Sequence, residues 1–274
     1  MNVENYFIHT MSSPASRIGD DGALVGNRVY SKDLFFENIH FKRQWLTEYQ
    51  IGYKAMMVNI SDAIAMNAVP KYALLGIAMP RSMTLHQMDE LGRGIKSAAA
   101  QYGIEIIGGD TISNGKLDIS ITIISETTSP LLRKGVKVSD CIAYTGRIGE
   151  SARQLRYLLA GGKVHSQSRF VVPQLRQRFV QTARRYLRSG MDLSDGLFSD
   201  VEKLCDANRI TLNWSKRPCK RVGCSGEEYE MLIAFDRRHL KALKSISKLT
   251  RTPLTVVGTA KRGRFVNRCK RHHF

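Results

Sequence analysis

A fold of the α/β or α+β class, in two domains, is predicted by two features of this sequence. Short apolar segments typical of strands are mixed with longer helical segments. The character of the chain then changes over 127–140, which predicts a boundary near residue 135. We therefore expect a first domain over 1–135 and a second over 136–274.

The individual elements are predicted from the pattern of apolar residues and from the residues that typically begin or end helices and strands. The pattern predicts strands over 23–30, 34–41, 72–79, 104–107 and 117–125 in the first domain. A buried helix is predicted over 51–67 with Pro70 as its stop, and an amphipathic helix over 85–102 after Thr84. The second domain opens with a strand over 141–145, a glycine-containing turn and a helix from about Ser151.

The overall composition excludes several classes of protein. An apolar fraction of 43% supports a buried core, so a wholly disordered chain is excluded. No apolar run approaches the roughly 18 residues that a membrane span needs. The N-terminal segment has an early Glu4 and no apolar core typical of a secretory signal. We therefore expect a cytoplasmic protein without membrane association.

The five cysteines do not indicate a metal or redox site. They are odd in number, irregularly spaced and form no CxxC pair: Cys141, Cys205, Cys219, Cys224 and Cys269. We expect reduced thiols with mostly structural roles.

A formal charge of +18 leaves nucleic-acid binding open as an alternative function. The basic residues concentrate late, and from Arg147 to Arg188 only Glu150 is acidic. However, the sequence has no RRM, KH or C₂H₂ pattern, and aromatic residues are not regularly interleaved with the basic ones. A solvated basic face is the simpler interpretation, and we expect no specific nucleic-acid partner.

Aspartates carry the clearest chemical signal. Seven of the 13 aspartates stand in compact motifs, most of them beside Gly, Ser or Thr: Gly19-Asp20-Asp21, Ser31-Lys32-Asp33, Ser61-Asp62, Gly109-Asp110-Thr111 and Asp192-Leu193-Ser194-Asp195-Gly196. Each motif alone is typical of a turn or a helix cap. Together, converging carboxylates repel one another unless cations lie between them. Oxygen ligands without Cys or His pairs favour magnesium, which binds carboxylates and substrate phosphates.

The common nucleotide-binding motifs are missing. The sequence contains no GxxxxGK[ST] and no HRD or DFG set, and its nearest approach to GxGxxG lies within a predicted helix. An ATP site must therefore belong to another scaffold.

The order of the motifs resembles thiamine-monophosphate kinase, within the aminoimidazole-ribonucleotide-synthetase-like superfamily. The resemblance covers roughly residues 15 to 235, and its most specific parts are the run from Lys54 to Pro70 and the motif MDLSDGL at 191–197. It implies magnesium-assisted transfer of a phosphoryl group from ATP directly to thiamine monophosphate, with several Mg²⁺ ions. It also implies a two-domain fold with an N-terminal α/β domain that joins a partner's strands in a homodimer and a C-terminal α+β domain. The ligands would lie in the cleft between the domains.

The resemblance implies a role for particular residues. Those matched to magnesium binding are Asp21, Ser31, Asp33, Asp62, Asp110, Asp192 and Asp195. Those matched to ATP binding are Gly109, Asp110, Arg133 and Ser194. His40 and Glu227 match positions on the thiamine monophosphate side, and no catalytic residue is assigned beyond the metal ligands.

The sequence departs from the family at a few positions. Lys32 stands where the family usually has threonine, and a lysine side chain cannot replace a hydroxyl ligand. The stretch from Arg169 to Arg176 differs from the usual R-H-L-R-P-S-P-R, and no residue that stacks on the thiamine rings is assigned. Other superfamily members are the remaining alternatives, such as a selenophosphate synthetase or a hydrogenase-maturation dehydratase. The former should carry a reactive cysteine near the N-terminus, whereas the first cysteine here is Cys141.

Overall fold

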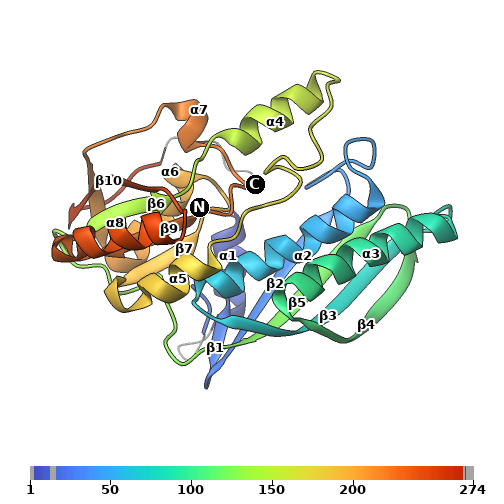
Figure 1. The fold of residues 1–274 in the computed structure, drawn as a ribbon, viewed down its shortest axis with the longest axis horizontal. Coiled ribbons are helices and arrows are strands. Elements are labelled where there is room, and N and C mark those ends of the chain that lie inside the picture. The colour runs from blue at the N-terminus through green and yellow to red at the C-terminus, as the bar shows by residue number, and fades with distance from the viewer. Residues whose placement is uncertain (1–2, 13–16, 268, 270–274) are drawn as a thin grey trace.

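The computed structural model describes residues 3–12, 17–267 and 269, and these form two five-stranded sheets side by side (Figure 1). The first sheet has the order β1-β2-β5-β3-β4, with β1 (Ala23–Val25), β2 (Arg28–Phe36), β3 (Val69–Pro80), β4 (Glu105–Asn114) and β5 (Asp118–Glu126). The second has the order β7-β9-β6-β10-β8, with β6 (Cys141–Thr145), β7 (Ser189–Asp192), β8 (Ile210–Trp214), β9 (Met231–Phe235) and β10 (Leu254–Arg262).

One face of the first sheet packs against α2 (Glu48–Ala65) and α3 (Leu85–Tyr102). Alternate residues of β5 are fully buried under these helices, whereas their neighbours are half-buried, as expected for a strand with one covered face. The two helices lie so close that a Cβ atom on Gly94 would stand 2.0 Å from the Tyr49 carbonyl oxygen. Glycine is therefore required at this crossing.

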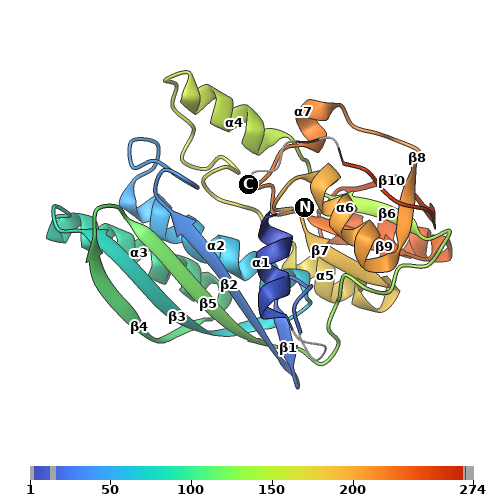
Figure 2. The same ribbon diagram turned by 180° about the vertical axis from the view of Figure 1, so that it is seen from behind.

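The opposite face of the first sheet carries no helix over β3, β4 and β5 among the described residues (Figure 2). Strand register places Leu34, Leu74 and Ile112 on this face, and their side chains are 48%, 39% and 60% exposed. An exposed apolar sheet face in a soluble domain marks an interaction surface. We call this surface the open face.

The second sheet is covered on both sides. Helix α6 (Leu197–Asn208) packs on one face, and α5 (Gln177–Ala183) and α8 (Leu240–Leu249) pack on the other. The remaining helical segments are α1 (Val3–Met11), α4 (Glu150–Leu159), α7 (Lys220–Gly223), and the 3₁₀ turns Arg184–Tyr186 and Arg237–His239. None of the described helices is both long enough and apolar enough to cross a membrane.

The mixed fold and most predicted elements are confirmed. The predicted helix over 85–102 has the predicted bounds, because Thr84 and Gln87 form a reciprocal cap and Gly103 ends the helix in the left-handed region. The change from the first sheet to the second falls between Glu126 and Cys141. The assignment of two domains divided at residue 135 stays a prediction.

Four elements were predicted with wrong boundaries. The strand predicted over 23–30 is interrupted by a turn at Gly26, which has φ 61°, and is divided between β1 and β2. Strand β2 ends at Phe36, so His40 lies in a turn in which Asn38 has φ 67°, not in a strand over 34–41. Pro70 lies inside β3 and does not end the preceding helix, which stops at Ala65. Strand β4 continues through Gly108-Gly109-Asp110, because pairing with β3 holds these glycines extended.

The expectation that all thiols are reduced is also wrong. Cys224 and Cys269 form a disulfide with a Cα–Cα distance of 5.8 Å, which is within the usual range. The two cysteines are 45 residues apart, and only the fold brings them together. Cys141, Cys205 and Cys219 are free thiols, as expected.

Candidate active site

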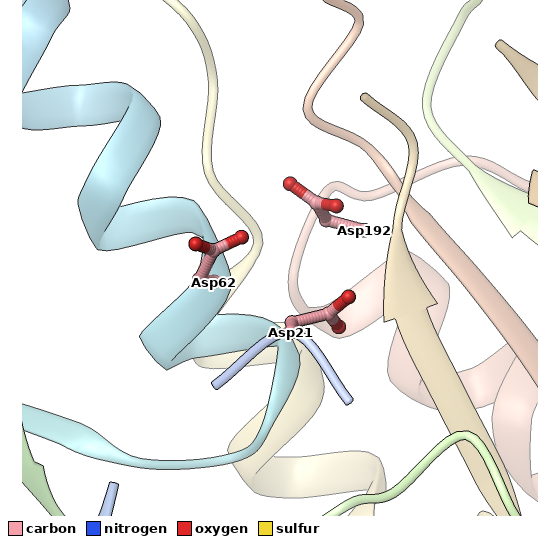
Figure 3. A group of neighbouring side chains, drawn as sticks. All are labelled: Asp21, Asp62 and Asp192. Carbon is pink, nitrogen blue, oxygen red and sulfur yellow. The ribbon is translucent and has the colours of Figure 1, made fainter. Parts of the chain in front are cut away.

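Three aspartates from separate parts of the chain converge between the two sheets (Figure 3). Asp21 lies in the loop before β1, Asp62 on α2 and Asp192 at the end of β7. Each offers a carboxylate oxygen, and these oxygens all lie within 4.8 Å of one another. We call these residues the aspartate cluster.

The cluster concentrates negative charge in a buried place. Burial raises the pKa of Asp62 well above its usual range, and repulsion from Asp33, Asp192 and Asp21 raises it further. Burial and the Asp21 carboxylate raise the pKa of Asp192 in the same way, although Ser61 donates a 2.6 Å hydrogen bond to it. Such an arrangement is relieved by a bound cation, and an all-oxygen ligand set fits magnesium.

Arg133 is the cation that contacts the cluster directly. Its guanidinium forms an ion pair with Asp21, with 3.1 Å between Nε and Oδ1. Its backbone N–H donates to Asp20 Oδ1 at 2.7 Å. Burial lowers the pKa of Arg133, but the carboxylates of Asp21, Asp192 and Asp200 together outweigh this and raise it overall. For Asp21 the opposite holds, because burial raises its pKa more than Arg133 lowers it.

A cavity of about 470 Å³ extends from the cluster and contains most of the predicted site residues. Its lining includes nine of them: Asp21, Asp33, His40, Asp62, Arg133, Asp192, Ser194, Asp195 and Glu227. Aromatic and apolar side chains also line the cavity, among them Ile39, Trp45, Leu155 and Phe170. Phe170 contacts Lys54, which lies about two helical turns from Asp62 on α2. The cavity thus has an anionic end and an aromatic end.

The loop from Glu227 to Glu230 is fixed by contacts that its three glutamates make with other parts of the chain. Glu227 accepts a 2.7 Å hydrogen bond from Lys54 Nζ, and its backbone N–H donates to the Ser194 carbonyl. Glu228 accepts from the N–H groups of Gly149 and Ser151 at the start of α4. Glu230 is fully buried and pairs with both Arg169 and Arg176.

His40 lies beside the aromatic end. Its ring stacks on Phe35 with 5.7 Å between ring centres. Its Nδ1 accepts a 3.0 Å hydrogen bond from the Phe36 backbone N–H, so the neutral ring carries its proton on Nε2. The turn that follows β2, rather than a strand, aims this ring into the cavity.

Two predicted ligands lie elsewhere in the chain. Asp110 is exposed on the edge strand β4, where its carboxylate accepts from the Thr111 backbone N–H. The neighbouring residue, Gly109, is aligned across the sheet with Leu75 of β3, Ile121 of β5 and Asp33 of β2, in that order. Asp110 is thus three strands, or about 14 Å, from the anionic end of its own chain.

Ser31 is buried and does not belong to the cavity lining, and its assignment as a ligand stays a prediction. Its hydroxyl donates to the Asn59 carbonyl at 3.3 Å, and the Asn59 side chain in turn accepts from the Asp33 backbone N–H at 2.8 Å. Lys32, at the position where the family has threonine, extends across the open face to Ser120 on β5 at 2.7 Å.

Sequence reasoning missed several residues around the anionic end. Lys203 on α6 forms ion pairs with Asp195 and with the fully buried Asp200, the latter at 3.2 Å. Burial raises the pKa of Asp200 to about 7. A spacing of five residues between Asp195 and Asp200 across the start of a helix was the available signal. Sequence reasoning also missed Lys54, which contacts Glu227 and not the anionic end, although it is the only charged residue in the run from Ile51 to Ser61.

Comparisons with known proteins agree with this geometry. The family described as AIR synthase related protein, N-terminal domain, matches residues 19–127. A thiamine-monophosphate kinase from Rhodopirellula baltica is 31% identical over 272 residues, which cover 88% of this chain and 82% of the relative.

Solved structures share the fold over nearly the whole chain. The structure described as AaThiL complexed with AMPPCP and TMP has a TM-score of 0.88 at 24% identity, and the match covers 99% of this chain and 96% of that one. Escherichia coli HypE, a hydrogenase maturation protein, has a TM-score of 0.71 at 16% identity, covering 98% and 96%. The fold alone therefore does not select among activities, and the sequence match and the site must do so.

Proposed function

We propose that this chain, which belongs to the thiamine-monophosphate kinase family, transfers the terminal phosphoryl group of ATP to thiamine monophosphate and so forms thiamine diphosphate. One observation carries the proposal. Nine of the twelve residues matched to the metal, nucleotide and acceptor sites of that family line a single cavity, and they come from both halves of the chain. The solved structure with the same fold is described as complexed with AMPPCP and TMP, and these ligands are consistent with the same assignment.

Magnesium is the proposed metal at the anionic end. Asp21, Asp62 and Asp192 would hold it, and Asp33 and Asp195 line the same cavity. Bound Mg²⁺ ions neutralise the phosphates of ATP and of the acceptor, which otherwise repel each other. The buried and mutually repelling carboxylates of the cluster fit this role, because they lack enough cations of their own.

The remaining residues of the cavity orient the two substrates. Arg133 presents a guanidinium suited to phosphate oxygens, and Ser194 lines the same cavity. His40 and Glu227 hold the acceptor near the aromatic end. The acceptor phosphate is already ionised near neutral pH, so the transfer needs no general base and proceeds directly, by positioning and charge neutralisation.

A homodimer is proposed as the working form. The open face exposes apolar side chains over several strands, and pairing two such faces buries them. The dimer also gives Asp110 a role, since it lies on the edge strand β4, three strands or about 14 Å from Asp33 of its own chain. We propose that Gly109 and Asp110 act at the site of the partner subunit. A cytoplasmic location stays a prediction.

The reaction is tested by direct detection of its product. Purified protein is incubated with ATP, thiamine monophosphate and Mg²⁺, and thiamine diphosphate is measured by chromatography. We expect one thiamine diphosphate for each ADP released, and no product in EDTA. ATP consumption without thiamine diphosphate would refute the proposed function and favour another member of the superfamily.

A further inference from the structure

Lys54 is a buried cation next to the aromatic end of the cavity. Its side chain, on α2, is 1% exposed, and its Nζ donates to Glu227 Oε2 at 2.7 Å. The rings of Phe170 and Phe35 also contact the ammonium, with their centres 4.1 Å and 5.8 Å from Nζ. Two aromatic faces and one carboxylate therefore form a closed cage around the ammonium.

The cage joins the two halves of the molecule. Lys54 and Phe35 belong to the first sheet and its covering helix, whereas Phe170 and Glu227 belong to the second half. Both Phe170 and Glu227 line the cavity, while Lys54 contacts them from behind. The lysine can therefore act on a ligand only through these two residues.

Glu227 is fixed in a position that its own backbone does not favour. It has φ 54°, in the left-handed region that a residue with a Cβ atom seldom adopts. Its N–H donates to the Ser194 carbonyl at 2.7 Å, and its carbonyl accepts from Ser151 Oγ at 2.8 Å. The Lys54 ammonium is the contact that fixes the carboxylate itself. The side chain is 29% exposed, so it remains available to a ligand.

Helix α2 relates this cage to the aspartate cluster. Lys54, Val58 and Asp62 are spaced four residues apart and lie on one side of the helix. Val58 and Asp62 both line the cavity. Lys54 thus lies about 12 Å along the helix from Asp62, at the opposite end of the same ligand site.

A buried ammonium is a poor device for stability alone. The free energy lost when the ammonium is dehydrated offsets most of the favourable electrostatic energy of the ion pair. Replacing a buried ion pair by apolar residues is therefore often neutral or stabilising. We propose that Lys54 is a positioning residue that fixes the Glu227 carboxylate toward the acceptor and so sets affinity for thiamine monophosphate. This inference rests on the proposed function and names a further residue of that site.

The test is a double-mutant cycle read by calorimetric binding. Lys54→Met, Glu227→Gln and the double variant are titrated with thiamine monophosphate and, separately, with the ATP analogue AMPPCP. We expect Lys54→Met to weaken acceptor binding by about tenfold or more and to leave AMPPCP binding unchanged. In the Glu227→Gln background, Lys54→Met should cause no further loss, because the lysine acts through that glutamate.

Controls separate this role from a structural one. Arg43→Met removes the cation of another ion pair, Arg43–Glu48 at 2.8 Å, whose residues do not belong to the cavity lining. It should leave both affinities unchanged. Lys54→Met should remain folded, because the residual charge, Glu227, reaches solvent. Glu227→Gln should be less stable than Lys54→Met, because it leaves the ammonium buried and unpaired.

Each outcome decides the inference. Unchanged acceptor affinity in Lys54→Met overturns it, and so does an equal loss of acceptor and AMPPCP affinity, which would indicate a general structural role. Additive losses in the double variant also overturn it. If the unmodified protein itself does not bind thiamine monophosphate, the proposed function fails whatever the variants do.

Discussion

Acidic residues at the two ends of the cavity are neutralised in different ways. On the loop from Glu227 to Glu230, two glutamates pair with cations of the chain: Glu227 with Lys54, and Glu230 with two arginines. Glu228 has no such cation: it accepts from backbone N–H groups at the start of α4, and burial raises its pKa. In the aspartate cluster, three carboxylates share one directly ion-paired cation, Arg133. The pKa values of all three are raised, chiefly by burial.

We infer from this difference that the loop glutamates stabilise the wall of the site, whereas the cluster aspartates bind the cation of the ligand. A carboxylate with a fixed cation or N–H donors is satisfied when the protein folds. Carboxylates that are buried together without enough cations cost stability until a metal arrives. The same type of side chain thus builds the wall at one end of the cavity and holds the proposed Mg²⁺ at the other.

Among the substitutions that test this difference between the two ends of the cavity, removal of one cluster carboxylate should have the largest effect on activity. We expect Asp62→Asn to lower kcat by at least about 10²-fold, because a metal-held charge stabilises the transferring phosphoryl group. The same change should raise the melting temperature of the metal-free protein, since it removes a repelling charge. Steady-state kinetics and calorimetry measure the two effects.

A substitution of an exposed aspartate outside the cluster serves as the control for this prediction. Asp89 is an exposed aspartate on α3, and Asp89→Asn should change neither the rate nor the melting temperature. A near-normal rate in Asp62→Asn would rule out a metal site at the cluster.

Mixing subunits tests whether Asp110 belongs to the cluster of the partner. We expect the Asp62→Asn and Asp110→Asn homodimers each to be nearly inactive. A heterodimer of the two carries both changes at one site and none at the other. Random mixing of equal amounts should therefore recover about a quarter of the normal activity. No recovery in mixed dimers, verified by mass spectrometry, would place Asp110 at the site of its own chain.

The dimer itself is tested at the open face. Leu74→Asp puts a charge among the exposed apolar side chains and should yield a monomer near the chain mass of 30.9 kDa in light scattering. Leu159→Asp on α4, where Leu159 is 62% exposed outside this face, should leave the mass unchanged. An active, strictly monomeric unmodified protein would contradict the dimer.

The free energy of unfolding should depend on pH because several buried aspartates have raised pKa values. Burial raises the pKa of Asp200 to about 7, so between about pH 4 and pH 7 the folded state binds more protons than the unfolded state. The free energy of unfolding therefore falls as the pH rises through this window, by at most about 4 kcal/mol for this group. Asp62 and Asp192 act in the same direction.

Thermal melts in EDTA measure this effect. We expect the melting temperature to fall from about pH 5 to about pH 8, and Asp200→Asn to reduce the slope. Added Mg²⁺ should recover stability at the higher pH, because it binds the ionised cluster. A melting temperature that rises over this range in EDTA would contradict the electrostatic account.

Local signals in the sequence were sufficient for part of the structure. The helix over 85–102 was predictable because its cap residues and its terminal glycine are adjacent in sequence. Asp21, Asp62 and Asp192 were predicted as ligands from motifs, and the structure brings them together. In contrast, glycines 108 and 109 indicated a strand end, but pairing with β3 carries β4 past them.

Long-range pairing explains what the sequence did not reveal. Lys54 and Glu227 are 173 residues apart, and neither motif identifies the other as its partner. The disulfide between Cys224 and Cys269 likewise depends on the fold. Asp110 matches a ligand motif, yet the sheet order places it on the far edge from Asp33, which no local pattern could show.

The most direct test of the contrast between the two ends is metal binding itself. Mn²⁺, whose electron paramagnetic resonance signal falls when it binds, can be titrated into the unmodified protein and into Asp62→Asn and Glu227→Gln. We expect the unmodified protein and Glu227→Gln to bind Mn²⁺ alike, and Asp62→Asn to bind it at least about tenfold more weakly. Equal Mn²⁺ affinity in Asp62→Asn and the unmodified protein would contradict the assignment of the aspartate cluster as the metal site.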